Sequence, residues 1–400
     1  MAGAWARRMN VPLRRVAVGC AVLMFVSLGQ VSQVQTFGAD ALRLDHRNLR
    51  AQLDRFGHPR GDLLTRSGGI LAASVRQRGR FGFRRVYPGG ASYAAVTGYL
   101  SLHGATGMEA ARNAVLSGAD PRVRVRALIG GFGPGAAASV RLTIDERAQR
   151  AAHQALRASG RRGAVVVLEP ATGAILALVS QPSYDPERLA THDPAALRRT
   201  ETDLARAPGD PLVNRALNRS YPLGPALGII TRAARLGGGP VRRQAEGLGF
   251  NAPGLYVPLR VAPSVFPGKG ARATPLEIAM LSAAVANGGV LMRPHLVHEI
   301  RTRDGTVLER TMPSPYSRAM SAKVAGRIAR MMTRDGADVG TAAGAAIPGE
   351  ATVATGFAPA GRPEVAVGVT VEPSGPTDGT AGSYSARAVA TAVLKSMTAG

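Results

Sequence analysis

Apolar residues occur in short blocks separated by turns rich in Gly and Pro, and the blocks predict a mixture of strands and helices. The clearest pair is 164–168 and 174–179, two apolar runs joined by five residues that include Pro170 and Gly173. This pattern predicts a β-hairpin. A third apolar run at 365–371 predicts another strand, and residues 140–144 alternate in the way a half-buried strand does.

Helix patterns lie between these strands. Asp145 is placed to cap a helix that ends near residue 158, and further helices are expected at 194–206, 321–332 and 386–397. Thr274, Pro275 and Glu277 form the pattern of a capping box before a run, 278–286, that is apolar on every side. A helix without a polar face belongs between layers. The elements together indicate an α/β fold in which helices sandwich an antiparallel sheet.

The N-terminus has a different character. Residues 1–15 carry four arginines, and 16–34 contain no charge over about the length that a bilayer crossing needs. This pattern predicts a cytoplasmic tail at 1–15, an uncleaved transmembrane signal-anchor at 16–36 and an extracytoplasmic body at the plasma membrane. A Gly-rich linker at 130–138 then divides the body into a β-rich domain, 37–138, and a second domain, 139–400.

The chain is strongly basic, with 50 Lys and Arg against 26 Asp and Glu, a net charge of +24. Such a charge suits nucleic acid, an anionic membrane or an acidic polymer, although a coding preference for arginine is the simplest explanation. Nucleic acid is disfavoured because the arginines are dispersed and aromatic residues make up only 4%. Cys20 is the single cysteine, and His295 and His298 have no ligating partners nearby, so neither a metal nor a cofactor is expected.

One stretch, Asn214–Leu236, has the predicted loop and helix start that are typical of a catalytic segment. It predicts a loop that turns at Tyr221-Pro222 and enters a helix at Gly224-Pro225, which ends at the Gly run 237–239. A helix entered this way can present a nucleophile at its positive end and a base one turn later. Those two places hold Pro225 and Gly228, neither of which can do chemistry.

Motifs that follow one another in order cover nearly the whole chain: Pro59-Arg60-Gly61-Asp62, 104–109 (GATGME), Leu142–Asp145 with Gln149, GAVVVLEPATGAILALVSQPSYDP at 163–186, Asn214–Leu217, Tyr221-Pro222, the apolar helix after Thr274, and Met292–His295. Together they resemble the class B penicillin-binding proteins, above all the actinobacterial ones, which are membrane-anchored transpeptidases that cross-link peptidoglycan. The resemblance implies one membrane helix, a β-rich pedestal domain of the dimerisation type and a domain of the penicillin-recognising serine transpeptidase fold.

The resemblance also implies a catalytic set of three motifs around one cleft: Ser-x-x-Lys, Ser-x-Asn and Lys-Thr-Gly. At the first motif, Pro225 occupies the place of the serine and Gly228 that of the lysine. None of the three lysines follows a serine by three places or precedes Thr-Gly, and no asparagine follows a serine by two. The segment from Leu236 to Gly247, where Ser-x-Asn belongs, is compressed.

The third motif is expected to be lost with its strand. The chain passes from Val353-Ala354 directly to a Thr-Gly-Phe-Ala-Pro motif at 355–359, which in the family follows the Lys-Thr-Gly strand. The sheet is therefore expected to be shortened at one edge, where unpaired backbone could be exposed.

These observations favour a catalytically inactive paralogue that acts as a scaffold or regulator in peptidoglycan synthesis, with no catalytic residue. Its expected partners are membrane proteins of cell-wall synthesis or of the divisome, or anionic wall polymers; the oligomeric state is open. One alternative is an active D,D-transpeptidase with an unrecognised nucleophile, although Ser220 has no lysine or histidine at helical spacing. A second alternative is a decaying gene product or an error in the gene model.

Overall fold

The computed structural model describes residues 3–33, 55–131, 136–251, 257–266, 270–333, 339–343, 351–373 and 381–399. The chain divides into two compact units, Met1–Arg55 and Phe56–Gly400. The first contains helix α1 (Gly3–Gln33), on which Leu23 and Phe25 are among the exposed apolar side chains. Over the described residues, no helix combines the length and apolar character needed to cross a membrane. The anchor therefore stays a prediction.

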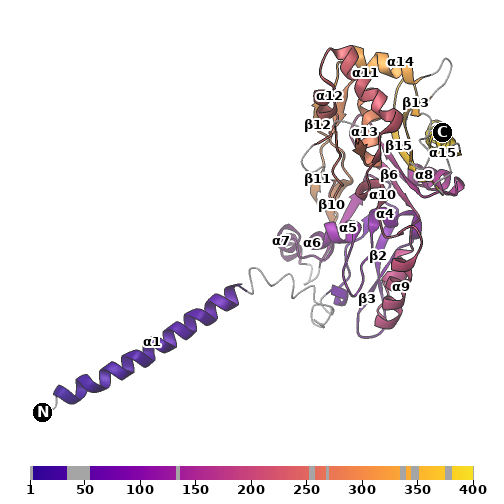
Figure 1. Cartoon of the computed structure of the whole chain (residues 1–400). Coiled ribbons are helices and arrows are strands. Elements are labelled where there is room, and N and C mark those ends of the chain that lie inside the picture. Colours follow the sequence, from indigo (N-terminus) through magenta and orange to yellow (C-terminus); the bar gives the residue numbers. More distant parts are fainter. Residues whose placement is uncertain are drawn as a thin grey trace. The chain divides into compact units, whose positions relative to one another are not determined.

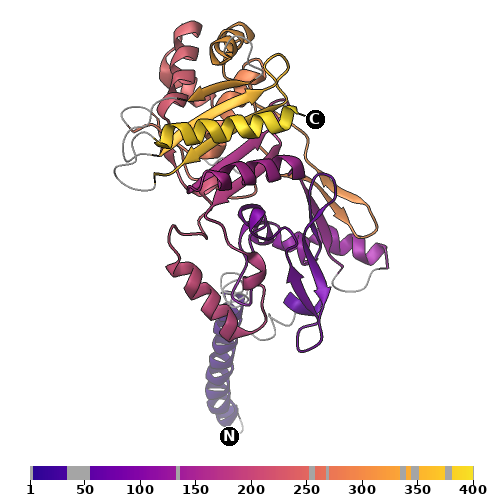
Figure 2. The same cartoon turned by 90° about the vertical axis from the view of Figure 1, so that its right-hand side faces the viewer.

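A five-stranded antiparallel sheet forms the centre of the second unit (Figure 1). Its order is β13-β14-β15-β5-β6, with bounds Gly340–Ala343, Thr352–Ala358, Val365–Val371, Gly163–Leu168 and Ile175–Gln181. The predicted hairpin is the β5–β6 pair, which is in antiparallel register from Gly163 opposite Gln181. Figure 2 shows helices α15 (Ala381–Thr398) and α8 (Glu146–Ala158) across one face of this sheet.

Helices cover both faces of the sheet, which explains why β5 is apolar at every position. On β5, Val165 and Val167 pack in the cluster that contains α8 and α15. The alternate residues Val166 and Leu168 pack in the cluster that contains α13 (Pro275–Ala286). Successive side chains of a strand point to opposite faces, so a doubly covered strand needs an apolar residue at each position. The predicted sandwich is confirmed.

Helix α13 is the buried layer that the sequence predicts. Every residue from Pro275 to Val285 is buried. Its capping box is formed: the Thr274 hydroxyl accepts from the Glu277 backbone N–H at 3.3 Å, and a Glu277 carboxylate oxygen accepts from the Thr274 N–H at 2.8 Å. Burial raises the pKa of the Glu277 carboxyl, while these hydrogen bonds oppose the rise. The box therefore supplies partners for polar groups that have no access to water.

Thr274→Val, which keeps the shape of the side chain and removes its hydroxyl, is expected to lower the free energy of unfolding by about 1–2 kcal/mol. The reason is that the Glu277 N–H then loses its acceptor in a buried place. Ser321→Ala removes a cap of the same kind from the exposed start of α14 (Ala322–Met332) and should cost less. Urea unfolding of both variants measures the difference. Equal losses would show that burial of the cap is unimportant.

A second, six-stranded sheet combines segments of both predicted domains. Its order is β11-β10-β4-β1-β2-β3, and only the β1–β4 pair is parallel among its described pairs. In that order the bounds are Val307–Arg310, Val297–Thr302, Ala138–Leu142, Leu63–Leu64, Ile70–Arg76 and Phe83–Val86. Strands β10 and β11 come from the second predicted domain, which accounts for a single compact unit from Phe56 onward. The boundary at residue 138 stays a prediction.

Short elements connect these layers. Two small antiparallel pairs are β12 (Pro315–Arg318) with β9 (Val290–Met292) and β7 (Tyr221–Pro222) with β8 (Arg272–Ala273). Further helices and 3₁₀ turns within the described residues of this unit are η2 (Gly90–Ser92), α4 (Ala94–Thr97), α5 (Gly107–Ala111), α6 (Asn113–Leu116), α7 (Pro121–Ile129), η3 (Pro186–Leu189), α9 (Pro194–Arg206), α10 (Arg215–Asn218), η4 (Gly224–Ala226), α11 (Leu227–Gly237) and α12 (Val241–Gly247).

The N-terminal motifs meet in a buried ion cluster. The Glu109 carboxylate accepts from Arg85 Nε at 2.6 Å and from Arg60 Nη2 at 3.1 Å. Arg60 also donates through Nη1 to Asn113 Oδ1 at 3.0 Å, and Arg85 through Nη1 to Ser74 Oγ at 3.4 Å. Glu109 is fully buried, and the two guanidinium groups are 3% and 1% exposed. This cluster joins the start of the body to α5, α6 and β2.

Candidate functional site

The stretch Asn214–Leu236, which the sequence marks as a possible catalytic segment, folds largely as its sequence predicts. Asn214 caps α10, and the chain then pairs briefly as β7 before the 3₁₀ turn η4 leads into α11. Helix α11 ends at Gly237, and Gly238 closes it in the left-handed conformation at φ 69°. A residue other than glycine is strained at such a φ, which is why a glycine run ends this helix. The helix start itself packs against β13 and β14.

The two positions that should hold the nucleophile and its base lie at this start. Pro225 is inside η4, and Gly228 is in the first turn of α11. Arg232, one turn further, lies over Gly228: a Cβ added at Gly228 would be 3.0 Å from its Nη1. The exposed guanidinium therefore lies beside this position, and it would need to shift by only a few tenths of an ångström to admit a Cβ at residue 228.

Hydroxyl groups near the helix start are committed to backbone carbonyls. The Thr231 hydroxyl donates to Leu227 O at 3.2 Å and lies 3.3 Å from Gly228 O, and the Ser220 hydroxyl donates to Pro263 O at 3.4 Å. The lysines in the described part of the chain, Lys323 and Lys395, are exposed on α14 and α15. A serine needs an adjacent base to become a nucleophile, and the described residues provide none here.

The places of the other two motifs are also changed. Only Gly238, Gly239 and Pro240 separate α11 from α12, so the loop that would carry Ser-x-Asn is very short. At the edge of the sheet, β13 pairs with β14 from Gly340 opposite Phe357 to Ala343 opposite Ala354. The edge that was expected to be exposed is therefore covered by a four-residue strand, Gly-Thr-Ala-Ala, which has no lysine.

A buried carboxylate that the sequence analysis missed supports the approach to this site. Glu372, directly after β15, accepts from the Tyr221 hydroxyl at 2.8 Å and from Arg215 Nε at 3.1 Å. Arg219 and Arg162 lie 3.2 and 3.5 Å from the same carboxylate. Burial, followed by the charge of Glu372, raises the pKa of the Tyr221 hydroxyl. The only signal for Glu372 in the sequence is that it is a single acidic residue directly after an apolar strand.

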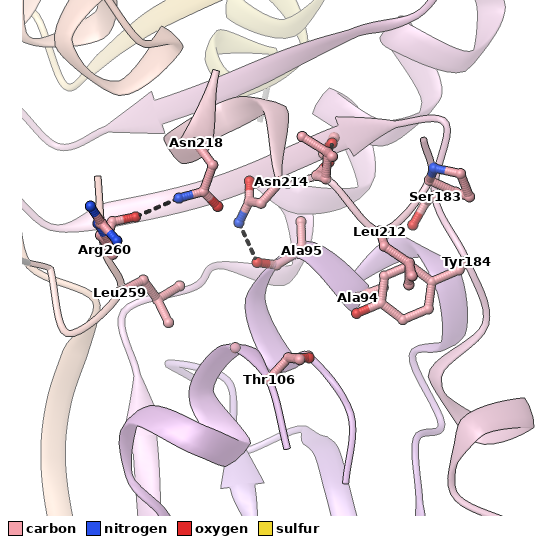
Figure 3. A pocket seen from close by; sticks show the side chains of 15 residues that line it. Ala94, Ala95, Thr106, Ser183, Tyr184, Leu212, Asn214, Asn218, Leu259 and Arg260 are labelled. Atoms are coloured by element: carbon pink, nitrogen blue, oxygen red, sulfur yellow. Dashed lines mark hydrogen bonds between the residues drawn. The ribbon is translucent and has the colours of Figure 1, made fainter. Parts of the chain in front are cut away.

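A cavity of about 300 Å³ lies on a different side of the same stretch, between the N-terminal motifs and α10 (Figure 3). Gly228 is not among its described lining residues. Its asparagines bond to backbone: Asn214 Nδ2 donates to Ala95 O and Asn218 Nδ2 to Arg260 O, both at 2.8 Å. The hydroxyl of Ser180, which also lines the cavity, donates to Val213 O at 3.1 Å. No nucleophile–base pair therefore faces this cavity among its described lining residues.

Similarity to known proteins decides the family. The model of the penicillin binding protein transpeptidase domain matches residues 163–236 and 264–395, more than half of the chain, and that of the penicillin binding protein A dimerisation domain matches 60–134. The chain belongs to the penicillin-binding protein family. Among described residues, no group of three His, Cys, Asp or Glu side chains is arranged to hold a metal ion.

Relatives within the penicillin-binding proteins match along almost the whole chain. Peptidoglycan D,D-transpeptidase PbpA of Mycolicibacterium smegmatis is 34% identical over 466 residues, covering 92% of this chain and 94% of the relative. PbpA of Mycobacterium tuberculosis is 33% identical, covering 91% and 94%. The ceftriaxone acyl-enzyme structure of penicillin-binding protein A from M. tuberculosis has a TM-score of 0.80 and 30% identity over 86% of this chain and 99% of that chain.

Two features of these matches mark differences between this chain and its relatives. The transpeptidase match skips residues 237–263, which begin at the end of α11. The alignment to the M. smegmatis relative is also longer than the 400 residues of this chain, although it uses only 92% of them. The relative therefore has residues inside the aligned region that this chain lacks.

Proposed function

We propose that this penicillin-binding protein serves peptidoglycan synthesis as a scaffold or regulator and does not catalyse acyl transfer. The observation that carries the proposal is the start of α11, where the resemblance places a serine and a lysine. Pro225 and Gly228 stand there, and neither offers a hydroxyl or an amine. Without a hydroxyl and a base at these positions, the family's covalent intermediate has no route of formation.

The rest of the site supports the same conclusion. Strand β13 has no lysine to hold a substrate carboxylate, and the segment after α11 is reduced to a three-residue turn. Removing one member of such a catalytic unit already abolishes most of the rate, and removing the others costs little more. The relatives' names describe transpeptidases, whereas this chain keeps their scaffold and lacks their three motifs.

The location is part of the proposal. The arginines of residues 1–15 and the uncharged run after them favour a helix that anchors the chain in the plasma membrane, with the body outside. A protein held there would meet membrane proteins of cell-wall synthesis or of the divisome. Crosslinking in cells followed by purification of the full chain is expected to recover such a protein. Repeated recovery of none under mild crosslinking would contradict the scaffold role.

The full chain in detergent is expected to form no covalent adduct with a fluorescent penicillin. Intact mass spectrometry should show an unchanged mass. Penicillin-binding protein A of M. tuberculosis, for which a penicillin G acyl-enzyme structure exists, is the positive control. The variant Pro225→Ser with Gly228→Lys should also stay unlabelled, because β13 has no lysine and the Ser-x-Asn loop is missing. A stoichiometric adduct on the unmodified chain would establish the alternative, an active transpeptidase, and peptide mapping would locate its nucleophile.

A further inference from the structure

Three helices at one end of the second unit form a surface that carries a local excess of positive charge. Helix α11 packs against both α12 and α14, and Figures 1 and 2 show the three together at the end of the unit that carries β12 and β13. They contain seven basic residues and one acidic residue, Glu246. Glu246 is bonded to Arg242 within α12, at 3.0 Å.

The other six basic side chains of this surface are exposed, and none has an ion pair with any residue in the described ranges. We call this set the cationic end: Arg232, Arg235, Arg243, Lys323, Arg327 and Arg330. Like charges gathered on helices that pack together repel one another, and an anionic ligand relieves the repulsion. The composition of the chain alone does not explain the arrangement, because a coding preference for arginine selects the type of cation but does not explain why these three helices carry seven cations and one carboxylate.

Some exposed arginines elsewhere on the unit have carboxylate partners within the described residues. Arg122 is 2.9 Å from Glu309, and Arg126 is 3.0 Å from Asp304. Helix α9 is more balanced than the cationic end: its three arginines share the helix with Glu201 and Asp203. The cationic end therefore differs from these surfaces in local charge balance, although the whole chain is basic.

We propose that the cationic end binds a polymer of phosphodiester-linked polyol units. Its charges are spread over three helices, which suits an extended ligand with a charge on each repeat better than one small anion. Arginine, which supplies five of the six cations, pairs with phosphate through a planar fork of N–H donors. Counterions released from the polymer then favour binding, as they do for other polyanions.

Two other polyanionic partners fit this surface less well. Helices α11, α12 and α14 contain no aromatic residue, so they offer no platform on which the bases of single-stranded nucleic acid could stack. A membrane surface needs apolar side chains to insert, and the exposed large apolar residues of these helices are Val241 and Met331 only. A polymer that presents phosphate groups without bases or acyl chains therefore fits this surface better than nucleic acid or a membrane does.

The cationic end includes the place where the family's lysine is missing. Arg232 lies beside Gly228, with its Nη1 3.0 Å from the place that a Cβ at residue 228 would take. Polymer binding here needs neither a nucleophile nor a base. The inference goes beyond the proposed function and does not rest on the absence of acyl transfer, so penicillin labelling and polymer binding succeed or fail separately.

The test measures binding of fluorescent poly(glycerol phosphate) to the full chain in detergent, from about 0.05 to 0.2 M salt, a range over which polyanion affinities fall steeply. The variant Arg232→Gln, Arg235→Gln, Arg327→Gln is expected to bind about tenfold more weakly or worse, with a salt slope smaller by about 3. The matched control removes three exposed arginines from α9, Arg198→Gln, Arg199→Gln and Arg206→Gln. It changes net charge equally and should lose no more than about twofold, since general attraction is weak at a distance in salt.

Every other outcome overturns the proposal. Equal losses of affinity in the two triple variants would show that the polymer is attracted by the net charge of the protein and has no specific binding site. No loss in the cationic-end variant would place binding elsewhere. Tighter binding of single-stranded DNA with the same number of phosphates, or capture by anionic vesicles through the same three residues, would assign the surface to nucleic acid or to a membrane. A thermal unfolding transition unchanged in both variants confirms that the comparison is between folded proteins.

Discussion

Glu109→Ala is expected to lower the free energy of unfolding by about 3–5 kcal/mol, the usual cost of removing one partner from a buried ion cluster. The carboxylate of Glu109 is the only anion that Arg60 and Arg85 contact in the described part of the chain. Without it, the Arg60 and Arg85 side chains, which are 3% and 1% exposed, keep their charge with no described carboxylate in contact. Burial already lowers the pKa of Arg60, with the charge of Glu109 opposing it, so the variant removes the main group that stabilises this cation.

The expected loss is large because the cluster is not fully satisfied even with Glu109 present. Arg60 Nε and Arg85 Nη2 are buried and have no hydrogen-bond partner among the described residues. Urea unfolding of the full chain in detergent measures the change, with Asp203→Ala as the control. Asp203 and Arg188 are exposed and 3.8 Å apart, a pair worth at most about 0.5 kcal/mol. A loss below about 1 kcal/mol in Glu109→Ala would mean that water enters the cluster and that the pedestal does not depend on it.

Elements whose signals lie close together in the sequence are the ones that the sequence predicts well. The hairpin of β5 and β6, the helix capped by Asp145 and the apolar helix after Thr274 all have their pattern and their end signals within about twenty residues. The sandwich follows from them, because an all-apolar helix requires a layer on each side. The fold class is therefore predictable from local patterns together with the family resemblance.

Pairing between distant segments is what the sequence does not reveal. Strand β13 replaces the expected edge strand with four small residues, Gly340–Ala343, which have no strong strand pattern of their own. Their position is fixed by the unpaired backbone of β14 beside them. Glu372 is likewise separated from Tyr221 and Arg215 by more than 150 residues in the chain, so no spacing rule connects them.

The sequence predicts which catalytic residues the candidate site lacks better than it predicts which residues surround the site. The places of Pro225 and Gly228 at a helix start follow from the sequence, because the motif around Tyr221-Pro222 fixes them. That Arg232 covers Gly228 does not follow, since a helical spacing of four residues permits the contact without requiring it. The cationic end could not be predicted from the sequence either, because its three helices are separated by up to about 100 residues and meet only in the fold.

Gly368→Ala is expected to lower the free energy of unfolding by about 3 kcal/mol, at the upper end of the range for overpacking in a core. Gly368 lies in the middle of β15, where α13 crosses the sheet. A Cβ at this position would be 2.4 Å from Pro275 O and 2.5 Å from Ala279 N. Both are backbone atoms of a helix buried on every side, so α13 must move away from the sheet and leave other contacts unfilled.

Gly361→Ala is the matched control, because it places the same methyl group in the turn between β14 and β15, where nothing lies within 4 Å. We expect that change to stay within about 0.5 kcal/mol, as surface substitutions usually do. Urea unfolding with an unchanged dependence on denaturant would assign the difference between the two variants to the native state. A Gly368→Ala protein as stable as Gly361→Ala would show that α13 can retreat freely from β15. The turn η4, which leads into α11 and packs against β14 in the same sheet, would then rest on a layer less rigid than the close contact at Gly368 implies.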